Sequence, residues 1–267
     1  MIRPPAVAGR FYPSEPETLA KQIAEFVSST SEKVRALGCI VPHAGYMYSG
    51  PVAGAVYASV EIPKKCILLG PRHFPRGEPM AILSEGSFAT PLGEAQIDAQ
   101  LATALAHECS ELREDAMAHE REHSLEVQIP FLQTLAKYFR FVPVVLATDR
   151  FGAIEKLGRA VAKVVAEASE PVLVIASTDM NHFEDDATTR IKDGRAIEQI
   201  LALDPRGLYD TVRGEGITMC GYAATTAMLI AMRELGATEA RLVRYATSGD
   251  AGGDREHVVG YAGIVIR

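Results

Sequence analysis

The chain has 267 residues, which is near the upper limit for one hydrophobic core and long enough to bury a large one. Hydrophobic residues make up 48% and charged residues 23%, as in an ordinary globular protein, and the net charge of -7 argues against general binding to nucleic acids or anionic membranes. The sequence has neither a signal peptide nor an apolar run of the roughly 18 residues that a membrane helix needs, so we expect a cytoplasmic protein.

Helical and strand patterns alternate along the chain. The first predicted helix, at 14–28, would begin with a capping box formed by Ser14 and Glu17. The other predicted elements are a strand at 39–41, a helix after Pro51 at 52–60, a strand at 66–70, helices at 98–108 and 124–138, a strand at 141–147, a helix at 153–168, a strand at 172–177, helices at 188–203, 205–212 and 221–235, and strands at 241–246 and 258–266.

Several of these strands are continuously apolar, which is typical of a parallel sheet covered on both faces. We therefore predict one α/β domain over residues 1–267, with a mainly parallel central sheet and helices on both faces. The last two strands are joined by a glycine-rich loop and are expected to form an edge hairpin.

Three predicted strands each lead into a segment that contains a histidine: His43, His73 and His182. In an open parallel sheet, ligands bind outside the carboxyl ends of the strands. Neutral imidazole binds borderline metals and exchanges protons near neutral pH. One strand–helix unit separates His43 from His73, so adjacent strands would present both to one ion. Each histidine alone could equally make a capping or loop hydrogen bond, but the set favours a functional site.

Two further segments carry candidate site residues. Cys220 begins an apolar helical segment, where the helix dipole favours a thiolate suited to binding a metal or acting as a nucleophile. The alternative is a small residue packed at a helix start. His123 precedes another predicted helix and could reach the same sheet edge, while Glu126 could orient a second histidine. A surface capping arrangement is an equally good interpretation of that segment.

Seven segments in family order resemble the MEMO family, which is called AmmeMemoRadiSam system protein B in prokaryotes. They are AGRFYP (8–13), PHAGYMYSG (42–50), LGPRH (69–73), EHSLEVQIPFL (122–132), STDMNHF (177–183), Cys220-Gly221 and YATSGD…VVGYAG (245–263). The family resembles in fold the class III extradiol (LigB-like) dioxygenases, which hold a non-haem iron at strand ends.

The resemblance implies that His43, His73 and Cys220 are metal ligands. It implies that His182 is the catalytic acid or base and that Asp179 lines the pocket. A thiolate in place of the dioxygenases' carboxylate shifts the preference from iron towards copper or zinc. It also places an oxidisable ligand at the site. We therefore expect Fe(II) or Cu, with Zn as an alternative, and no ring-cleaving activity.

Other interpretations of the pocket remain open. It could bind a peptide, a small anion or another small molecule without catalysis, with Arg72 as the anion-recognising group and with Tyr46, His123 and Glu126 also lining it. Arg72 stands where the family commonly has a smaller polar residue.

The third interpretation is a metal-free hydrolase with Cys220 as nucleophile and His182 as base, oriented by Asp179. The resemblance also implies two associated proteins, a radical-SAM protein and an AMMECR-type domain protein.

Overall fold

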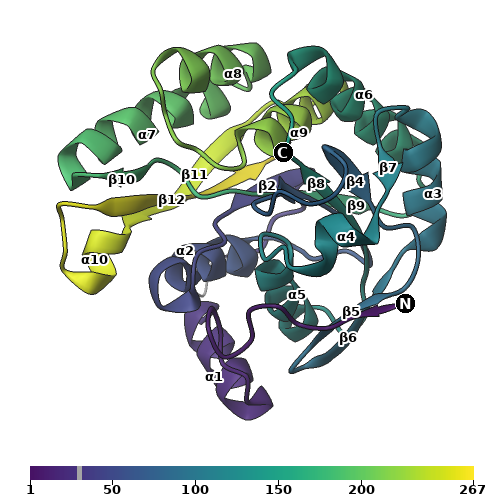
Figure 1. Cartoon of the computed structure of the whole chain (residues 1–267), viewed down its shortest axis with the longest axis horizontal. Coiled ribbons are helices and arrows are strands. Elements are labelled where there is room, and N and C mark those ends of the chain that lie inside the picture. Colours follow the sequence, from purple (N-terminus) through teal and green to yellow (C-terminus); the bar gives the residue numbers. More distant parts are fainter. Residues whose placement is uncertain (29–31) are drawn as a thin grey trace.

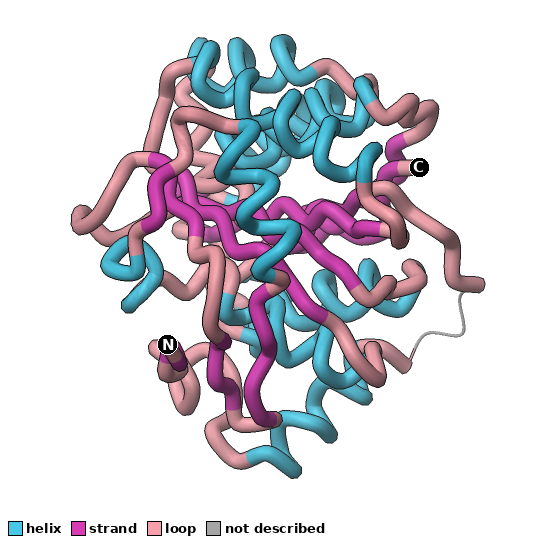
Figure 2. The backbone as a smooth tube through the Cα atoms, turned by 90° about the vertical axis from the view of Figure 1, so that its right-hand side faces the viewer, coloured by secondary structure: helices cyan, strands magenta, loops and turns pink. Residues whose placement is uncertain are grey.

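Five parallel strands form the centre of the molecule (Figures 1 and 2). In spatial order they are β6 (Gly93–Ile97), β8 (Arg140–Leu146), β3 (Lys65–Pro71), β9 (Val172–Ser177) and β2 (Gly38–Val41). This computed structural model describes residues 1–28 and 32–267. The predicted strands at 39–41, 66–70, 141–147 and 172–177 are confirmed. All residues of β2 and β9 are buried, as their apolar composition requires.

Antiparallel strands extend the sheet beyond β2. β12 (Val258–Ile266) pairs with β2, with β11 (Ala240–Thr247) and with β10 (His182–Glu184). The predicted pairing of the last two strands is therefore confirmed. Their connection contains a short helix that the sequence did not indicate, α10 (Ser248–Gly252), which Thr247 and Asp250 start with a capping box.

Short strands extend the opposite side of the sheet. They are β1 (Ile2–Arg3), β4 (Met80–Ile82), β5 (Ser87–Thr90) and β7 (Arg113–Glu114). Strands of two to four residues are too short to show an apolar period, so the sequence did not predict them.

Helices cover both faces of the sheet, which confirms the predicted α/β architecture (Figures 1 and 2). One layer contains α1 (Pro16–Phe26), α2 (Tyr46–Ser59) and α5 (Ile129–Leu135). The other contains α3 (Ala99–Glu108), α6 (Phe151–Glu167), α7 (Asp186–Leu201), α8 (Pro205–Gly214) and α9 (Tyr222–Glu234). Within residues 1–28 and 32–267, no helix combines the length and apolarity that crossing a bilayer requires.

Three local predictions differ from the structure. The capping box at Ser14 and Glu17 is wrong, because α1 has Glu15 as its N-cap and makes no side-chain capping bond. α2 begins at Tyr46 and includes Pro51, so it starts six residues before the predicted 52. The predicted helix at 124–138 is reduced to a 3-10 turn, η1 (Glu126–Gln128), followed by the short α5. Side chains at the start of that segment are committed to bonds with other parts of the chain, as described below.

The strand order corrects one expectation about the site. β2 and β3 are not adjacent, because β9 lies between them and pairs with both. Residues that follow β2 and β3 therefore meet across the end of β9, and the last residue of β9 becomes part of the site.

Candidate metal centre

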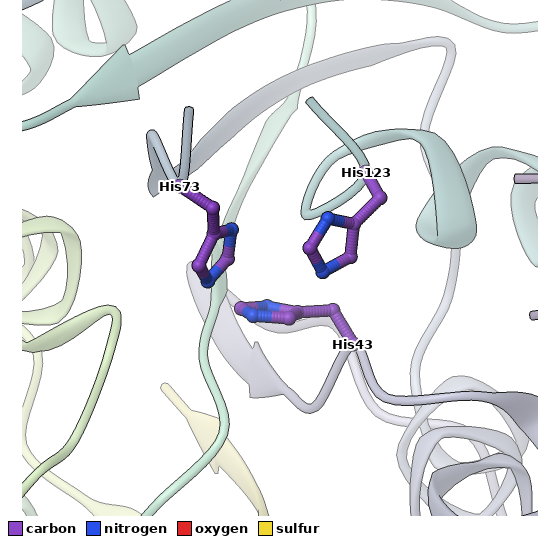
Figure 3. Close-up of side chains that lie close together, drawn as sticks. All are labelled: His43, His73 and His123. Carbon is purple, nitrogen blue, oxygen red and sulfur yellow. The ribbon is translucent and has the colours of Figure 1, made fainter. Parts of the chain in front are cut away.

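Three histidine side chains converge beyond the carboxyl ends of the central strands (Figure 3). His43 follows β2, His73 follows β3, and His123 lies between α4 (Ala116–Glu120) and η1. One ring nitrogen of each lies within 4.8 Å of those of the other two. The His43 ring centroid is 5.2 Å from that of His73 and 5.6 Å from that of His123, and the other two rings are stacked at 4.6 Å. His123, predicted to line the pocket, contributes its ring to this group of three.

The hydrogen bonds around Ser177 determine the tautomer of His43. The Ser177 hydroxyl donates its one proton to the Ser124 carbonyl at 2.6 Å and accepts from Gln128 Nε2 at 2.9 Å. His43 Nδ1, 2.9 Å from Ser177 Oγ, must therefore donate to it. Burial, together with the neighbouring His123 and His73, holds the pKa of His43 well below its usual value. His43 is thus neutral, and its Nε2 is unprotonated.

Glu122 orients His73 in the same way. His73 Nδ1 is 2.8 Å from Glu122 Oε1, and the other carboxylate oxygen accepts from the His73 backbone N–H. Burial opposes the charged forms, but this contact raises the pKa of His73 and lowers that of Glu122 to about 2. The carboxylate can only accept, so Nδ1 donates and Nε2 is left for a ligand. The His73 side chain is 30% exposed, which makes it the solvent-facing member of the group.

Glu126 and Tyr46, both predicted to line the pocket, are hydrogen-bonded to other parts of the chain. The Glu126 carboxylate is fully buried and bonds to Arg3 and to the N-terminal segment. The Tyr46 ring packs against Phe131, and its hydroxyl donates to the Val127 carbonyl at 2.7 Å. Glu122, rather than Glu126, accepts the hydrogen bond from a site histidine.

Cys220 directly contacts His43. Its Sγ lies 3.2 Å from His43 Nε2 and accepts a hydrogen bond from the Asp179 backbone N–H at 3.3 Å. Burial and then the Asp179 carboxylate raise the pKa of Cys220, so the group is a thiol in the absence of a cation. Cys220 is not a member of the group of three histidines, but its sulfur contacts one member of that group, His43.

The remaining predicted site residues are Asp179, His182 and Arg72. Asp179 Oδ1 accepts from the backbone N–H groups of His43 (2.7 Å) and Ala44 (3.3 Å), and burial raises the pKa of this carboxyl. His182 lies on β10 as a partly exposed residue. Its Nδ1 is buried and has no hydrogen-bond partner in the part of the chain that the structure describes, and the same is true of Nε and Nη1 of Arg72.

These donors suit a transition metal. Each of His43 and His73 gives Nδ1–H to a protein acceptor and keeps Nε2 free, which is the usual state of a metal-bound histidine. A nitrogen and a thiolate sulfur bound to one zinc-sized ion are about 3.1–3.6 Å apart. The 3.2 Å between Cys220 Sγ and His43 Nε2 lies in that range.

Three residues that orient the histidines were not predicted from the sequence: Glu122, Ser177 and Gln128. Glu122 directly precedes His123, and Ser177 is the polar last residue of an otherwise apolar strand. Both positions are weak sequence signals of a residue that contacts the site. Gln128 offered no signal, because its role depends on how residues 119–128 fold against β9.

Comparisons with known proteins agree with the motifs. The family model described as Memo-like protein matches residues 3–265. A MEMO1 family protein of Methanopyrus kandleri is 41% identical over 281 residues, covering 100% of this chain and 99% of its own. One from Methanothermobacter thermautotrophicus is 42% identical over 274 residues, covering 98% and 99%.

A more distant similarity concerns the fold alone. The crystal structure of an uncharacterized protein from Escherichia coli K12 has a TM-score of 0.53 and 13% identity, and the match covers 85% of this chain and 99% of that one. The full-length matches to the family model and to the archaeal relatives show that the chain belongs to the MEMO family.

Proposed function

We propose that this protein binds a redox-active transition metal, Fe(II) or Cu with Zn as an alternative, through His43, His73 and Cys220. One observation carries the proposal: the unprotonated Nε2 of an oriented, neutral His43 lies 3.2 Å from the Cys220 sulfur, beside two more imidazoles. His123 is the alternative to Cys220 as the third ligand. A thiolate favours the softer metals, whereas three imidazoles suit Zn, Cu and Fe alike.

Such an ion would supply Lewis acidity and, as iron or copper, one-electron redox chemistry. The chain's own groups would handle protons. Cys220 loses its proton when it becomes a ligand, so metal affinity should rise with pH. His182, whose Nδ1 has no partner among the described residues, would exchange a proton with a bound substrate, and Asp179 holds the backbone of His43 in place.

Metal analysis tests the proposal. Untagged protein is prepared anaerobically, offered Fe(II), Cu(I) or Zn(II), desalted and analysed for bound metal. We expect about one ion in the wild type and almost none in His43→Ala. Comparing Cys220→Ser with His123→Ala identifies the third ligand. His107→Ala is the matched control, because its side chain is 85% exposed and lies outside the site. If wild type and His43→Ala hold equally little metal, the proposal is wrong.

A second candidate is recognition of a small anion or an acidic peptide without catalysis. It is favoured by Arg72, next to His73, whose two buried guanidinium nitrogens have no acceptor among the described residues. Isothermal titration with phosphate or oxalate, comparing wild type with Arg72→Met, tests it. Binding that survives this substitution would remove the support.

The metal-free hydrolase has less support, because burial keeps Cys220 as a thiol and its nearest ring nitrogen belongs to His43. The radical-SAM and AMMECR-type partners implied by the family stay proposals, which a pull-down can test.

A further inference from the structure

One short segment, residues 119–128, contacts all three histidines. Glu122 accepts from His73, and His123 is itself part of the segment. Gln128 donates to Ser177 Oγ at 2.9 Å, and Ser177 in turn accepts from His43. The position of this segment therefore determines how all three rings are oriented.

Residues 3–12, the N-terminal strap, bind that segment through Arg3. The guanidinium donates to the His119 carbonyl (Nε, 2.8 Å), the Glu122 carbonyl (Nη2, 2.6 Å) and the Glu126 carboxylate (Nη1, 2.5 Å). Arg3 is 4% exposed and Glu126 is not exposed at all. Arg3 thus binds the residue that orients His73 as well as residues on both sides of it.

Glu126 completes the connection. Its carboxylate accepts from the backbone N–H groups of Ala6 (2.8 Å) and Val7 (3.0 Å) and from the Tyr12 hydroxyl (2.6 Å), in addition to Arg3. Further along the strap, the Phe11 ring packs edge-on against the His123 ring, with centroids 4.8 Å apart. The strap therefore contacts the site through directional bonds on one side and an aromatic ring on the other.

We propose that Arg3 and Glu126 are positioning residues of the metal centre, which orient His73 and His123 through residues 119–128. This inference rests on the proposed function. A buried ion pair is costly to desolvate and is often no more stabilising than apolar packing. The Arg3–Glu126 pair instead contributes directional hydrogen bonds, which fix backbone groups of the strap and of residues 119–128 relative to one another.

A matched pair of single-hydroxyl deletions separates positioning from general stability. Tyr12→Phe removes a 2.6 Å bond to the buried Glu126 carboxylate, and Tyr245→Phe removes a 2.7 Å bond to the buried Asp193 carboxylate. Both should lower Tm by similar amounts. Arg3→Lys provides a stronger perturbation, because an ammonium group cannot reproduce the three-way guanidinium contact.

The readout is Co²⁺ titration of the full chain, followed by the ligand-field spectrum. We expect Tyr12→Phe and Arg3→Lys to weaken Co²⁺ affinity about tenfold and to change the spectrum, as loss of an outer hydrogen bond typically does. Tyr245→Phe should stay within about twofold of wild type. Unchanged affinity and spectrum in both strap variants would overturn the inference.

A second readout works on the metal-free protein. The ¹⁵N chemical shifts of the His73 and His123 rings report tautomer and ring environment. They should shift in Tyr12→Phe and Arg3→Lys but not in Tyr245→Phe, and unchanged shifts would again overturn the inference. If wild type binds no Co²⁺ while these shifts change as expected, the proposed metal function fails and the positioning role stands.

Discussion

The candidate centre has two walls that differ in how their polar groups are used. The segment wall consists of residues 119–128. Its two buried glutamates are fully bonded, Glu122 to His73 and Glu126 to the N-terminal strap. The β9 wall consists of residues 177–182 with Cys220. It leaves His182 Nδ1 buried and unpaired within the described residues, and it leaves Cys220 facing His43. The fully bonded Glu122 orients a histidine, whereas the unused hydrogen-bonding capacity of His182 is available to whatever binds.

The two buried carboxylates of the site, Glu122 and Asp179, differ in the same way as the two walls to which they belong. Glu122 accepts from the His73 ring and from two backbone N–H groups, and its pKa falls to about 2. Asp179 accepts from two backbone N–H groups without a cation in contact, and burial raises its pKa. Comparable burial thus gives opposite charge preferences, because only one carboxylate has an imidazole in contact.

The largest expected effect comes from breaking the segment wall at Arg3. Arg3→Met leaves the Glu126 charge buried and unpaired, and we expect it to destabilise the protein by about 3–5 kcal/mol in urea unfolding. Arg72→Met is the control, because two of the Arg72 guanidinium nitrogens are buried without a partner among the described residues. That variant should change stability by less than about 1 kcal/mol. Equal losses in both variants would contradict the contrast.

The pH dependence of stability should have opposite signs for the two carboxylates. Glu122 has a folded pKa of about 2, below its reference value of 4.5. Its contribution is present above pH 4.5 and is lost as the pH falls towards 2. It amounts to about 3 kcal/mol. The folded pKa of Asp179 is raised above 3.8, so stability is greatest below that pH and is lost as the pH rises through the folded pKa.

Urea unfolding of metal-free protein between pH 2 and pH 7 measures both slopes. Glu122→Gln should flatten the loss of stability between pH 4.5 and pH 2. Asp179→Asn should instead remove a loss that appears as the pH rises above 3.8. The difference in unfolding free energy between wild type and variant is plotted against pH for each position. Slopes of the same sign for both positions would show that the two carboxylates share one environment.

Metal affinity should also separate the walls. Glu122→Gln replaces the charged acceptor that holds His73 Nδ1–H, and we expect affinity to fall about 10–100-fold. Asp179→Asn keeps an oxygen that can accept from the His43 backbone N–H, so the loss should be smaller. Competition with a chromophoric chelator, under anaerobic conditions, gives both constants. A greater loss in Asp179→Asn would reverse the assignment of the orienting wall.

The sequence was sufficient for four of the five parallel core strands, all except β6, and for the residues that directly follow them. Continuous apolar runs such as 172–177 can be buried on both faces only in a covered sheet, and His43 and His73 lie where such strands end. The sequence was not sufficient for the roles of Glu122 and Glu126. Both precede or begin a helical pattern, and a capping role and a buried bonding role have the same local sequence.

The strand order was beyond the sequence as well. β9 follows β3 by about a hundred residues, yet it inserts between β2 and β3 and brings Ser177 against His43. The partners of Arg3 within residues 119–128 are 116 to 123 residues away in the chain. Pairings at this separation depend on tertiary packing, which no local period encodes.

The smallest expected effect lies on the β9 wall at His182. Its ring nitrogen Nδ1 has no partner among the described residues, while its backbone N–H donates to Thr218 Oγ1 at 2.7 Å and is kept by any side chain. His182→Ala should therefore change stability by less than about 1 kcal/mol. Thr218→Val removes that acceptor and should cost about 1–3 kcal/mol. If urea unfolding instead shows the larger loss for His182→Ala, the ring is part of the structural framework and offers no unused hydrogen-bonding capacity to a ligand.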